Sequence, residues 1–262
     1  MQSPNLVAVT NVPSPLLYLG VRTFADEAAV DYAIAVRQHE QYRDALQRCG
    51  CRVISLEVNR DHPDSVFVED TALVLDEVAI MMSPGATSRR DEPRAIEATL
   101  REYRTVVCVE PPATIDGGDI VRSGERLYVG ESQRTNPAGI AALTALSRTY
   151  GYEVASIPVF GCLHLKSACS ALPDGRFLVN ADWIDVSPLP SDRLLHVPHS
   201  EPWAGDVLVI GERIIVSDAF PETIELLEGQ GWEVVPVGVS EFAKVEGGVT
   251  CLSLVFDGQP RA

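Results

Sequence analysis

The stretch IVRSGERLYVGESQRTNPAGIAALTALSRTYGYEVASIPV (residues 120–159) contains the pattern that decides the fold. Two short apolar runs, 120–122 and 127–129, are joined by Ser-Gly-Glu, which is typical of a β-hairpin. A helical pattern follows over 136–150, Gly151 ends it, and 152–159 has the character of a strand. The stretch therefore predicts a unit of strand, strand, helix and strand.

The same order of elements recurs along the chain. Paired strands are expected at 72–75 with 78–82 and at 207–210 with 214–216, and helix-turn-strand patterns cover 31–58 and 222–237. Five units of about 262/5, or 52, residues follow, and the fourth is irregular. The units begin near Val7, Ala72, Ile120, Phe177 and Val207. Since such a unit buries its apolar face only against its neighbours, we expect a closed ring. The last strand, 250–256, should lie beside the first, and a cleft should lie at the hub.

Composition excludes several classes of protein. The 262 residues are 46% hydrophobic, and the apolar runs are far shorter than the roughly 20 residues of a membrane-spanning helix. Lys and Arg number 21 against 37 Asp and Glu, so the net charge of −16 argues against nucleic acid and favours a small cationic ligand.

The cysteines and the N-terminus point to the cytoplasm. The six cysteines have no metal-type C-x-x-C spacing, so we expect thiols in a reducing compartment. Residues 1–11 lack the pattern of a secretory signal.

Four short segments carry chemically active side chains. Taken singly, each has a structural explanation: an edge loop, a glycine turn, a core histidine and a packed cysteine. Together they supply a thiol nucleophile, a histidine to move protons and carboxylates that hold a cation, which suits attack on a guanidinium carbon. The segments are DSVFVED (64–70), TIDGGD (114–119), CLHLKS (162–167) and VEGGVTCLS (245–253).

Six blocks in their order along the chain resemble the dimethylarginine dimethylaminohydrolase family of the guanidino-modifying superfamily. The resemblance implies an α/β fold, the pentein-type five-bladed propeller of repeated strand-strand-helix-strand units. It also implies that residues 1–262 form a single catalytic domain. The blocks are DSVFVED (64–70), PGATSRR (84–90), TIDGGD (114–119), VGESQRTN (129–136), LHLKS (163–167) and KVEGGVTC (244–251).

The resemblance further implies roles for individual residues. The family's nucleophile falls on Cys251, its general acid and base on His164, and the carboxylate that pairs with the histidine on Asp116. No metal or organic cofactor is implied. The residues implied to bind the substrate are Asp64, Glu69 and Asp70 at the guanidinium, Phe67 beside it, Arg89 and Arg134 at the substrate carboxylate, Val245 near the nucleophile, and Val21 in the lid.

Two parts of the sequence depart from the family or match no role in it. The lid often carries an acidic residue, Gly and Leu, where this chain has Leu19-Gly20-Val21, so the alkyl preference and the physiological substrate stay open. Cys162 and Cys169 match no family role and are interpreted as structural.

The expected reaction is hydrolysis of an Nω-methylated arginine to citrulline and methylamine or dimethylamine through a covalent S-alkylthiouronium on Cys251. An arginine deiminase-like or amidinotransferase-like enzyme is an alternative that the chain length disfavours. A non-catalytic guanidino-binding protein and a scaffold with a structural cysteine are the others. The expected partner is a small guanidino molecule, with no nucleic acid or membrane, and the protein should be a monomer or homodimer.

Overall fold

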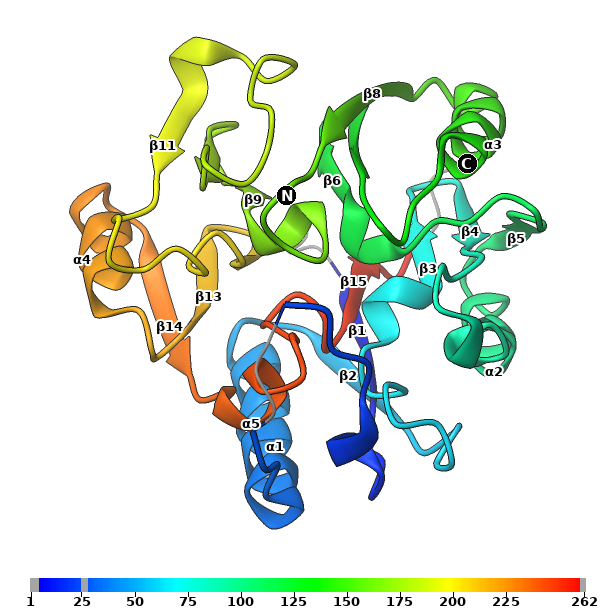
Figure 1. Cartoon of the computed structure of the whole chain (residues 1–262), viewed down its shortest axis with the longest axis horizontal. Helices are drawn as coiled ribbons and strands as arrows, with labels where there is room; N and C mark the ends of the chain where they lie inside the picture. The colour runs from blue at the N-terminus through cyan, green and yellow to red at the C-terminus, as the bar shows by residue number, and fades with distance from the viewer. Residues whose placement is uncertain (1–4, 25–27, 260–262) are drawn as a thin grey trace.

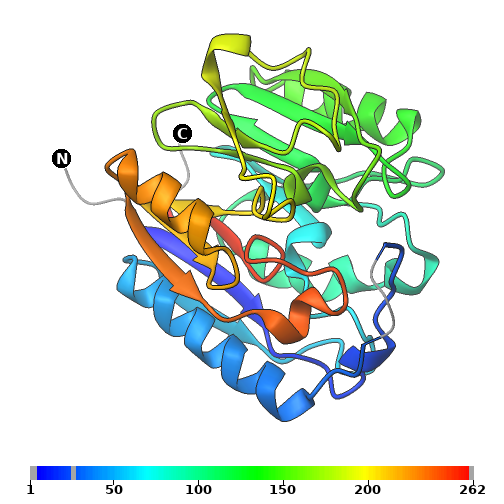
Figure 2. The same cartoon turned by 60° about the vertical axis from the view of Figure 1, so that its left-hand side comes forward.

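The computed structural model describes residues 5–24 and 28–259. Its strands form five three-stranded sheets that are arranged around a common centre like the blades of a propeller (Figure 1). The longer helices lie on the outside of the ring (Figures 1 and 2). In the described ranges, no helix is long and apolar enough to cross a membrane. The predicted ring of five units is confirmed.

Three blades repeat the predicted unit with little change. In each, the second strand is central, pairs antiparallel with the first strand and parallel with the third, and a helix connects the second strand to the third. These blades are β3 (Ala72–Val74), β4 (Val78–Met81), α2 (Glu92–Leu100) and β5 (Thr105–Cys108); β6 (Ile120–Ser123), β7 (Arg126–Glu131), α3 (Pro137–Arg148) and β8 (Glu153–Pro158); and β12 (Leu208–Ile210), β13 (Arg213–Ser217), α4 (Pro221–Gly229) and β14 (Glu233–Val237).

One blade is built from both ends of the chain. The strand β1 (Leu6–Asn11) is central, with β2 (Arg52–Leu56) parallel on one side and β15 (Leu254–Asp257) antiparallel on the other. The helix α1 (Tyr32–Arg48) connects β1 to β2. The ring therefore closes as predicted, but the last strand begins at Leu254 rather than at 250, because residues 249–252 form a turn at the hub.

The fourth blade is irregular, as the sequence indicates, but the predicted start near Phe177 is wrong. The blade begins at Cys169, and Phe177 begins its central strand, because a short first strand with no apolar run of its own precedes it. It contains β9 (Cys169–Ala171), β10 (Phe177–Val179) and β11 (Leu194–His196), and the connection from β10 to β11 ends in the 3₁₀ helix η6 (Ser191–Arg193) in place of an α-helix. The helix α2 and the short helix α5 (Ser240–Ala243) are elements that the sequence patterns did not reveal.

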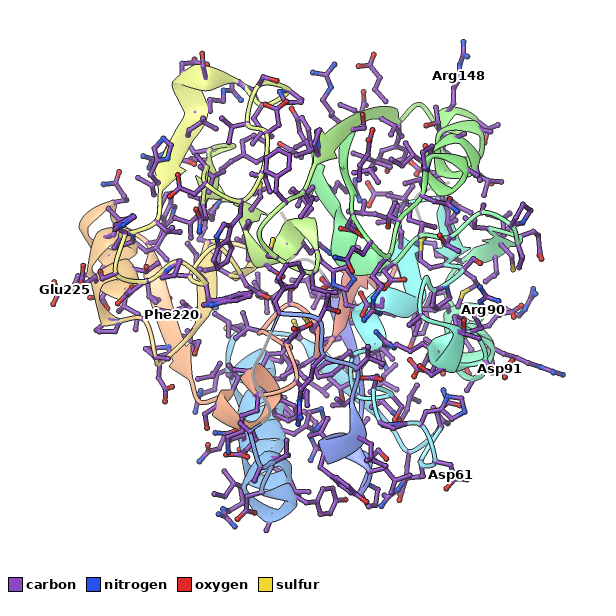
Figure 3. All side chains as sticks on the ribbon, viewed as in Figure 1. Asp61, Arg90, Asp91, Arg148, Phe220 and Glu225 are labelled. Carbon is purple, nitrogen blue, oxygen red and sulfur yellow. The ribbon has the colours of Figure 1, made fainter. Side chains whose placement is uncertain are left out.

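Local signals explain where the outer helices begin and end. The Asp31 side chain accepts from Ile34 N–H at the start of α1, and Asn136 accepts from Gly139 N–H at the start of α3. Gly50 and Gly151 follow these helices with φ of 95° and 88°, a conformation that favours glycine. Charged side chains such as Arg148 and Glu225 point away from the ring (Figure 3).

Three 3₁₀ turns bring polar side chains to the hub. The turns are η2 (Val68–Thr71), η4 (Gly117–Asp119) and η5 (Leu165–Ser167), and each directly precedes or lies just before the first strand of its blade. η4 is in contact with both η2 and η5. The inner ends of three blades therefore meet at the hub, where the predicted site lies.

Candidate active site

The hub turns carry most of the predicted functional side chains. Glu69 and Asp70 lie on η2, Asp116 directly precedes η4, and His164 directly precedes η5. The two glycines of η4 allow this close approach: a Cβ on Gly117 would lie 2.0 Å from Glu69 O, and one on Gly118 2.7 Å from His164 Nδ1. The glycine pair in TIDGGD is thus required by tertiary packing as well as by the turn.

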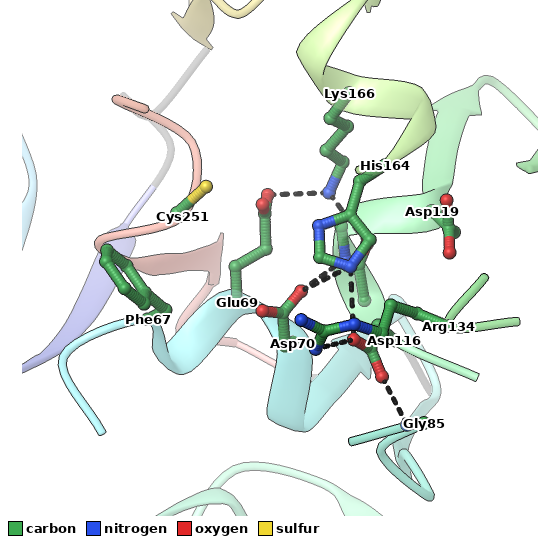
Figure 4. A network of polar contacts seen from close by, with 12 residues as sticks. Phe67, Glu69, Asp70, Gly85, Asp116, Asp119, Arg134, His164, Lys166 and Cys251 are labelled. Carbon is green, nitrogen blue, oxygen red and sulfur yellow. Dashed lines mark hydrogen bonds and ion pairs between the residues drawn. The ribbon is translucent and has the colours of Figure 1, made fainter. Parts of the chain in front are cut away.

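Cys251 lies in the turn between α5 and β15 and is partly buried. The backbone N–H of Gly248 donates to its Sγ at 3.3 Å. The turn is held from behind by Tyr42 of α1, whose hydroxyl lies 2.8 Å from Val249 O and 2.7 Å from Ser253 Oγ. Figure 4 shows the thiol across the hub from His164.

A small cavity is lined by both Cys251 and His164. Its volume is about 20 Å³, little more than the probe volume that one water requires. The predicted Glu69 and Asp116 lie outside its wall. It is lined by Val21, Asp64, Phe67, Asp70, Arg89, Arg134, Leu163, His164, Val245, Glu246, Gly247 and Cys251.

His164 is held between carboxylates. Its Nε2 lies 3.0 Å from Asp116 Oδ2 and 3.9 Å from Asp70 Oδ1 (Figure 4). Burial lowers the pKa of His164, but the charges of Asp70 and Asp119 and the hydrogen bond to Asp116 outweigh burial and raise this pKa to about 9. The imidazole is therefore protonated at neutral pH and can act as an acid.

Asp64 and Asp70 face the cavity in different electrostatic states. Burial raises the pKa of Asp64, against the opposing charge of Arg89. The pKa of Asp70 falls to about 2, because His164 and Arg89 together outweigh its burial. Two carboxyl groups that line one small cavity form a site that prefers a cation.

Glu69 is bound by two neighbours behind the cavity wall. Lys166 Nζ lies 2.6 Å from Glu69 Oε1, and Thr250 Oγ1 lies 3.0 Å from Oε2. The predicted contact between Glu69 and a substrate guanidinium would have to compete with these bonds.

The two arginines predicted to hold a substrate carboxylate are in different situations. The guanidinium of Arg89 is buried and donates to Asp70, to Glu92 and to the backbone oxygens of Asp64 and Phe67. Arg134 also lines the cavity, and its Nη1 lies 3.6 Å from Asp116 Oδ2.

The thiol of Cys251 is disfavoured as an anion. Burial and the negative charges of Asp206, Glu69 and Asp70 raise its pKa well above the usual value. A bound cation next to the sulfur would oppose these charges and favour the thiolate.

Asp70, Asp116 and His164 could in principle form a metal site, since one ligand atom of each lies within 4.8 Å of the others. Arg89 is paired with Asp70, and Arg134 lies near Asp116. Two adjacent guanidinium groups disfavour a metal cation here, and the cluster is better described as an ion-pair network.

The lid segment is tied to the cavity by carboxylates. Val21 N–H lies 3.2 Å from Asp64 Oδ1, and a Cβ on Gly20 would lie 2.9 Å from the same atom. Glu246 accepts from the N–H groups of Thr23 and Phe24. Val21 lines the cavity, whereas Leu19 is 56% exposed.

Lys166, Thr250 and Asp206 are among the residues near the site that had no predicted role. Lys166 and Thr250 are part of the quoted motif blocks. Their positions close to His164 and Cys251 in the chain could have indicated that they lie near the site. Asp206 lies before β12, where the sequence has no motif that could have revealed it.

The fold and the site together define a protein of the pentein class, a five-bladed α/β propeller with a thiol, an imidazole and carboxylates at its hub. A model of the family described as "N,N dimethylarginine dimethylhydrolase, eukaryotic" matches residues 21–164. A Streptomyces coelicolor protein named N(G),N(G)-dimethylarginine dimethylaminohydrolase is 41% identical over 96% of this chain and 97% of its own length. The chain belongs to the dimethylarginine dimethylaminohydrolase family.

Solved structures agree with this assignment. A cysteine-to-serine mutant of the enzyme from Pseudomonas aeruginosa, complexed with citrulline, has a TM-score of 0.89 and 32% identity, covering 95% of this chain and 98% of that one. A dimethylarginine dimethylaminohydrolase with a histidine-to-glycine change, as an adduct with S-methyl-L-thiocitrulline, has a TM-score of 0.91, 32% identity and the same coverage.

Proposed function

We propose that this protein hydrolyses Nω-methylated arginine to citrulline and methylamine or dimethylamine. The observation that carries the proposal is the small cavity whose wall Cys251, His164, Asp64 and Asp70 share. The names of the relatives support the substrate class, and the carboxylates fit the positive charge of a guanidinium group.

In the first half of the reaction, the Cys251 thiolate forms a bond to the guanidinium carbon. The thiol proton leaves to solvent as the substrate cation binds and offsets the neighbouring carboxylates. The C–N bond to the methylated nitrogen then breaks, and protonated His164 gives its proton to the departing amine. The product of this half is an S-alkylthiouronium on Cys251.

In the second half, a water molecule attacks the thiouronium carbon while neutral His164 takes a proton from it. Asp116 supports the imidazole in both steps, because its carboxylate accepts the hydrogen bond from Nε2–H and stabilises the imidazolium. The tetrahedral adduct then loses its hydroxyl proton to solvent, expels the thiolate and releases citrulline. Apart from water, the steps use groups that the chain itself supplies at the hub.

Assays with asymmetric dimethylarginine, monomethylarginine and arginine test the proposal. We expect citrulline and the matching amine from the methylated substrates, and an adduct on the Cys251 peptide when turnover is quenched for mass spectrometry. Cys251→Ser should abolish turnover and Cys169→Ser, a change at a fully buried thiol, should preserve it. Faster release of ammonia from arginine would favour a deiminase-like enzyme, and binding without any product would favour a guanidino-binding protein.

We also propose that residues 1–262 act as a single catalytic domain and that the protein is a monomer or homodimer. The pairing of β1 with β15 supports the first point, since it joins both ends of the described chain in one blade. The six cysteines are free thiols, which supports the expected reducing, cytoplasmic location.

A further inference from the structure

A second pocket lies on the other side of the turn that carries the nucleophile. Its volume is about 590 Å³, and it shares Glu246 and Gly247 with the wall of the active-site cavity. Asp206, which is only 8% exposed, lines it as well, and the mechanism above gives this carboxyl no role. The apolar part of the wall consists of Phe24, Trp203, Phe220, Val239, Ala243 and Val249.

Asp206 binds the nucleophile turn directly. Its Oδ1 accepts from the Thr250 N–H at 3.0 Å, and its Oδ2 lies 3.3 Å from Thr250 Oγ1. A Cβ on Gly248 would lie 2.1 Å from Oδ2, so glycine at this position makes room for the carboxyl group. Gly248 in turn donates to Cys251 Sγ, which links Asp206 to the sulfur through one residue.

The hydroxyl of Thr250 has one proton but two carboxyl neighbours. It lies 3.0 Å from Glu69 Oε2 and 3.3 Å from Asp206 Oδ2. Glu69 also accepts from the Lys166 ammonium at 2.6 Å, which favours the ionised form of Glu69 although burial raises its pKa. When the Thr250 proton is directed at Glu69, a protonated Asp206 can donate to Thr250 Oγ1 in the remaining contact.

The groups that face Asp206 favour its neutral form. Glu69 on η2 is negative, Lys166 on η5 is bonded to Glu69, and the thiol of Cys251 and the phenol of Tyr42 are uncharged. Burial and the charge of Glu69 raise the pKa of Asp206 to about 7, although Thr250 and Lys166 oppose the shift.

We propose that Asp206 is a positioning residue that controls the protonation of Cys251. As a neutral carboxyl it holds the turn through Thr250, and when it loses its proton its charge keeps Cys251 in the thiol form. This inference rests on the proposed role of Cys251.

The test compares the wild type with Asp206→Asn. The amide keeps the acceptor for Thr250 N–H and a donor for the Thr250 hydroxyl, but it cannot ionise. The measurement is the rate of Cys251 alkylation by iodoacetamide against pH, read by mass spectrometry of its peptide. Because the charge is absent at every pH, we expect the thiol pKa to fall by about one unit. An unchanged thiol pKa overturns the proposal.

Glu201→Gln is the matched control. Glu201 is a buried carboxylate that accepts from the N–H of Thr223 at 2.8 Å and from its hydroxyl at 2.7 Å, at the start of α4. We expect the alkylation profile of Cys251 to be unchanged in this variant, and an equal shift would overturn the proposal. The assay needs no substrate, so an error in the proposed reaction does not affect it.

A measurement on the wild type covers the case in which Asp206→Asn does not fold. The side-chain carboxyl carbon of Asp206, assigned through its backbone correlations, is followed by NMR against pH. A midpoint near 7 is expected. A midpoint near the ordinary aspartate value of about 4 would refute the neutral carboxyl.

Discussion

Nε2 of His164 lies 3.0 Å from Oδ2 of Asp116. The carboxylate accepts a hydrogen bond from Nε2–H. Nδ1 then remains to exchange a proton, on the side of the hub where Figure 4 places Cys251. Asp116 itself is held by the N–H of Gly85 at 2.8 Å, so the imidazole orientation depends on three separate blocks of sequence.

His164→Asn should lower kcat by about 10²- to 10⁴-fold, because it removes the acid for amine departure and the base for water attack. The fold should persist, which circular dichroism and thermal unfolding will check. A folded variant with less than about a tenfold loss would identify His164 as a packing residue.

Asp116→Asn should move the His164 titration to lower pH. The pKa of His164 in the folded protein is about 9, above its ordinary value of about 6.5, so the imidazole is protonated at neutral pH and loses its proton as pH rises through 9. Removing the hydrogen-bonded charge favours the neutral ring, so the NMR midpoint and the alkaline limb of activity should both fall.

His39 serves as the internal reference for that titration. Burial, helped by the charge of Arg43, lowers its pKa to about 3, so its resonances should stay constant across the same range. An Asp116→Asn protein whose His164 midpoint equals that of the wild type would contradict the assigned pairing.

Arg134→Ala should lower kcat/KM for substrates that carry an α-carboxylate and leave kcat/KM for agmatine-type substrates almost unchanged. Arg134 lines the cavity, and its Nη1 lies 3.6 Å from Asp116 Oδ2, so its other N–H groups are expected to bind a planar carboxylate. The measurement is kcat/KM for a methylarginine and for its decarboxylated analogue. Equal losses for both substrates would mean that Arg134 supports the site and not the ligand.

Arg89→Ala should behave differently and destabilise the protein. Its guanidinium is bonded to Asp70 and Glu92, which would remain buried without a counter-charge, and breaking such a pair costs about 3–5 kcal/mol. Urea unfolding measures this loss, with Arg134→Ala as the control. A variant as stable as the wild type would show that the Arg89 ion pairs add little.

Tyr42→Phe should lower both stability and kcat. The phenol is fully buried and lies within hydrogen-bond distance of Val249 O and Ser253 Oγ on either side of Cys251. Losing these bonds costs about 1–3 kcal/mol in the free energy of unfolding and loosens the nucleophile turn. A variant that is destabilised but keeps its kcat would show that Tyr42 stabilises the core and does not affect catalysis.

Much of the fold was predictable because its signals are local. Apolar runs, hairpin turns and helix-ending glycines such as Gly50 and Gly151 act within a few residues, and they repeat in each unit. The predicted start of the last strand, at residue 250, was wrong. The sequence pattern of 250–253 favours a strand, but contacts from Tyr42 and Asp206 hold these residues in a turn. Contacts from distant segments override local preference there.

The sequence by itself determined the ring of five units and the motif blocks that meet at its hub. Tertiary structure alone decided how the charges pair: Arg89 is committed to Asp70 and Glu92, Lys166 to Glu69, and Asp206 to the turn of Cys251. The bonds of Lys166 to Glu69 and of Asp206 to Thr250 join different blades, whereas Arg89 and Asp70 lie 19 residues apart in one blade. None of these three pairings leaves a periodic trace in sequence. They depend on burial and distance, which exist only after the ring has closed.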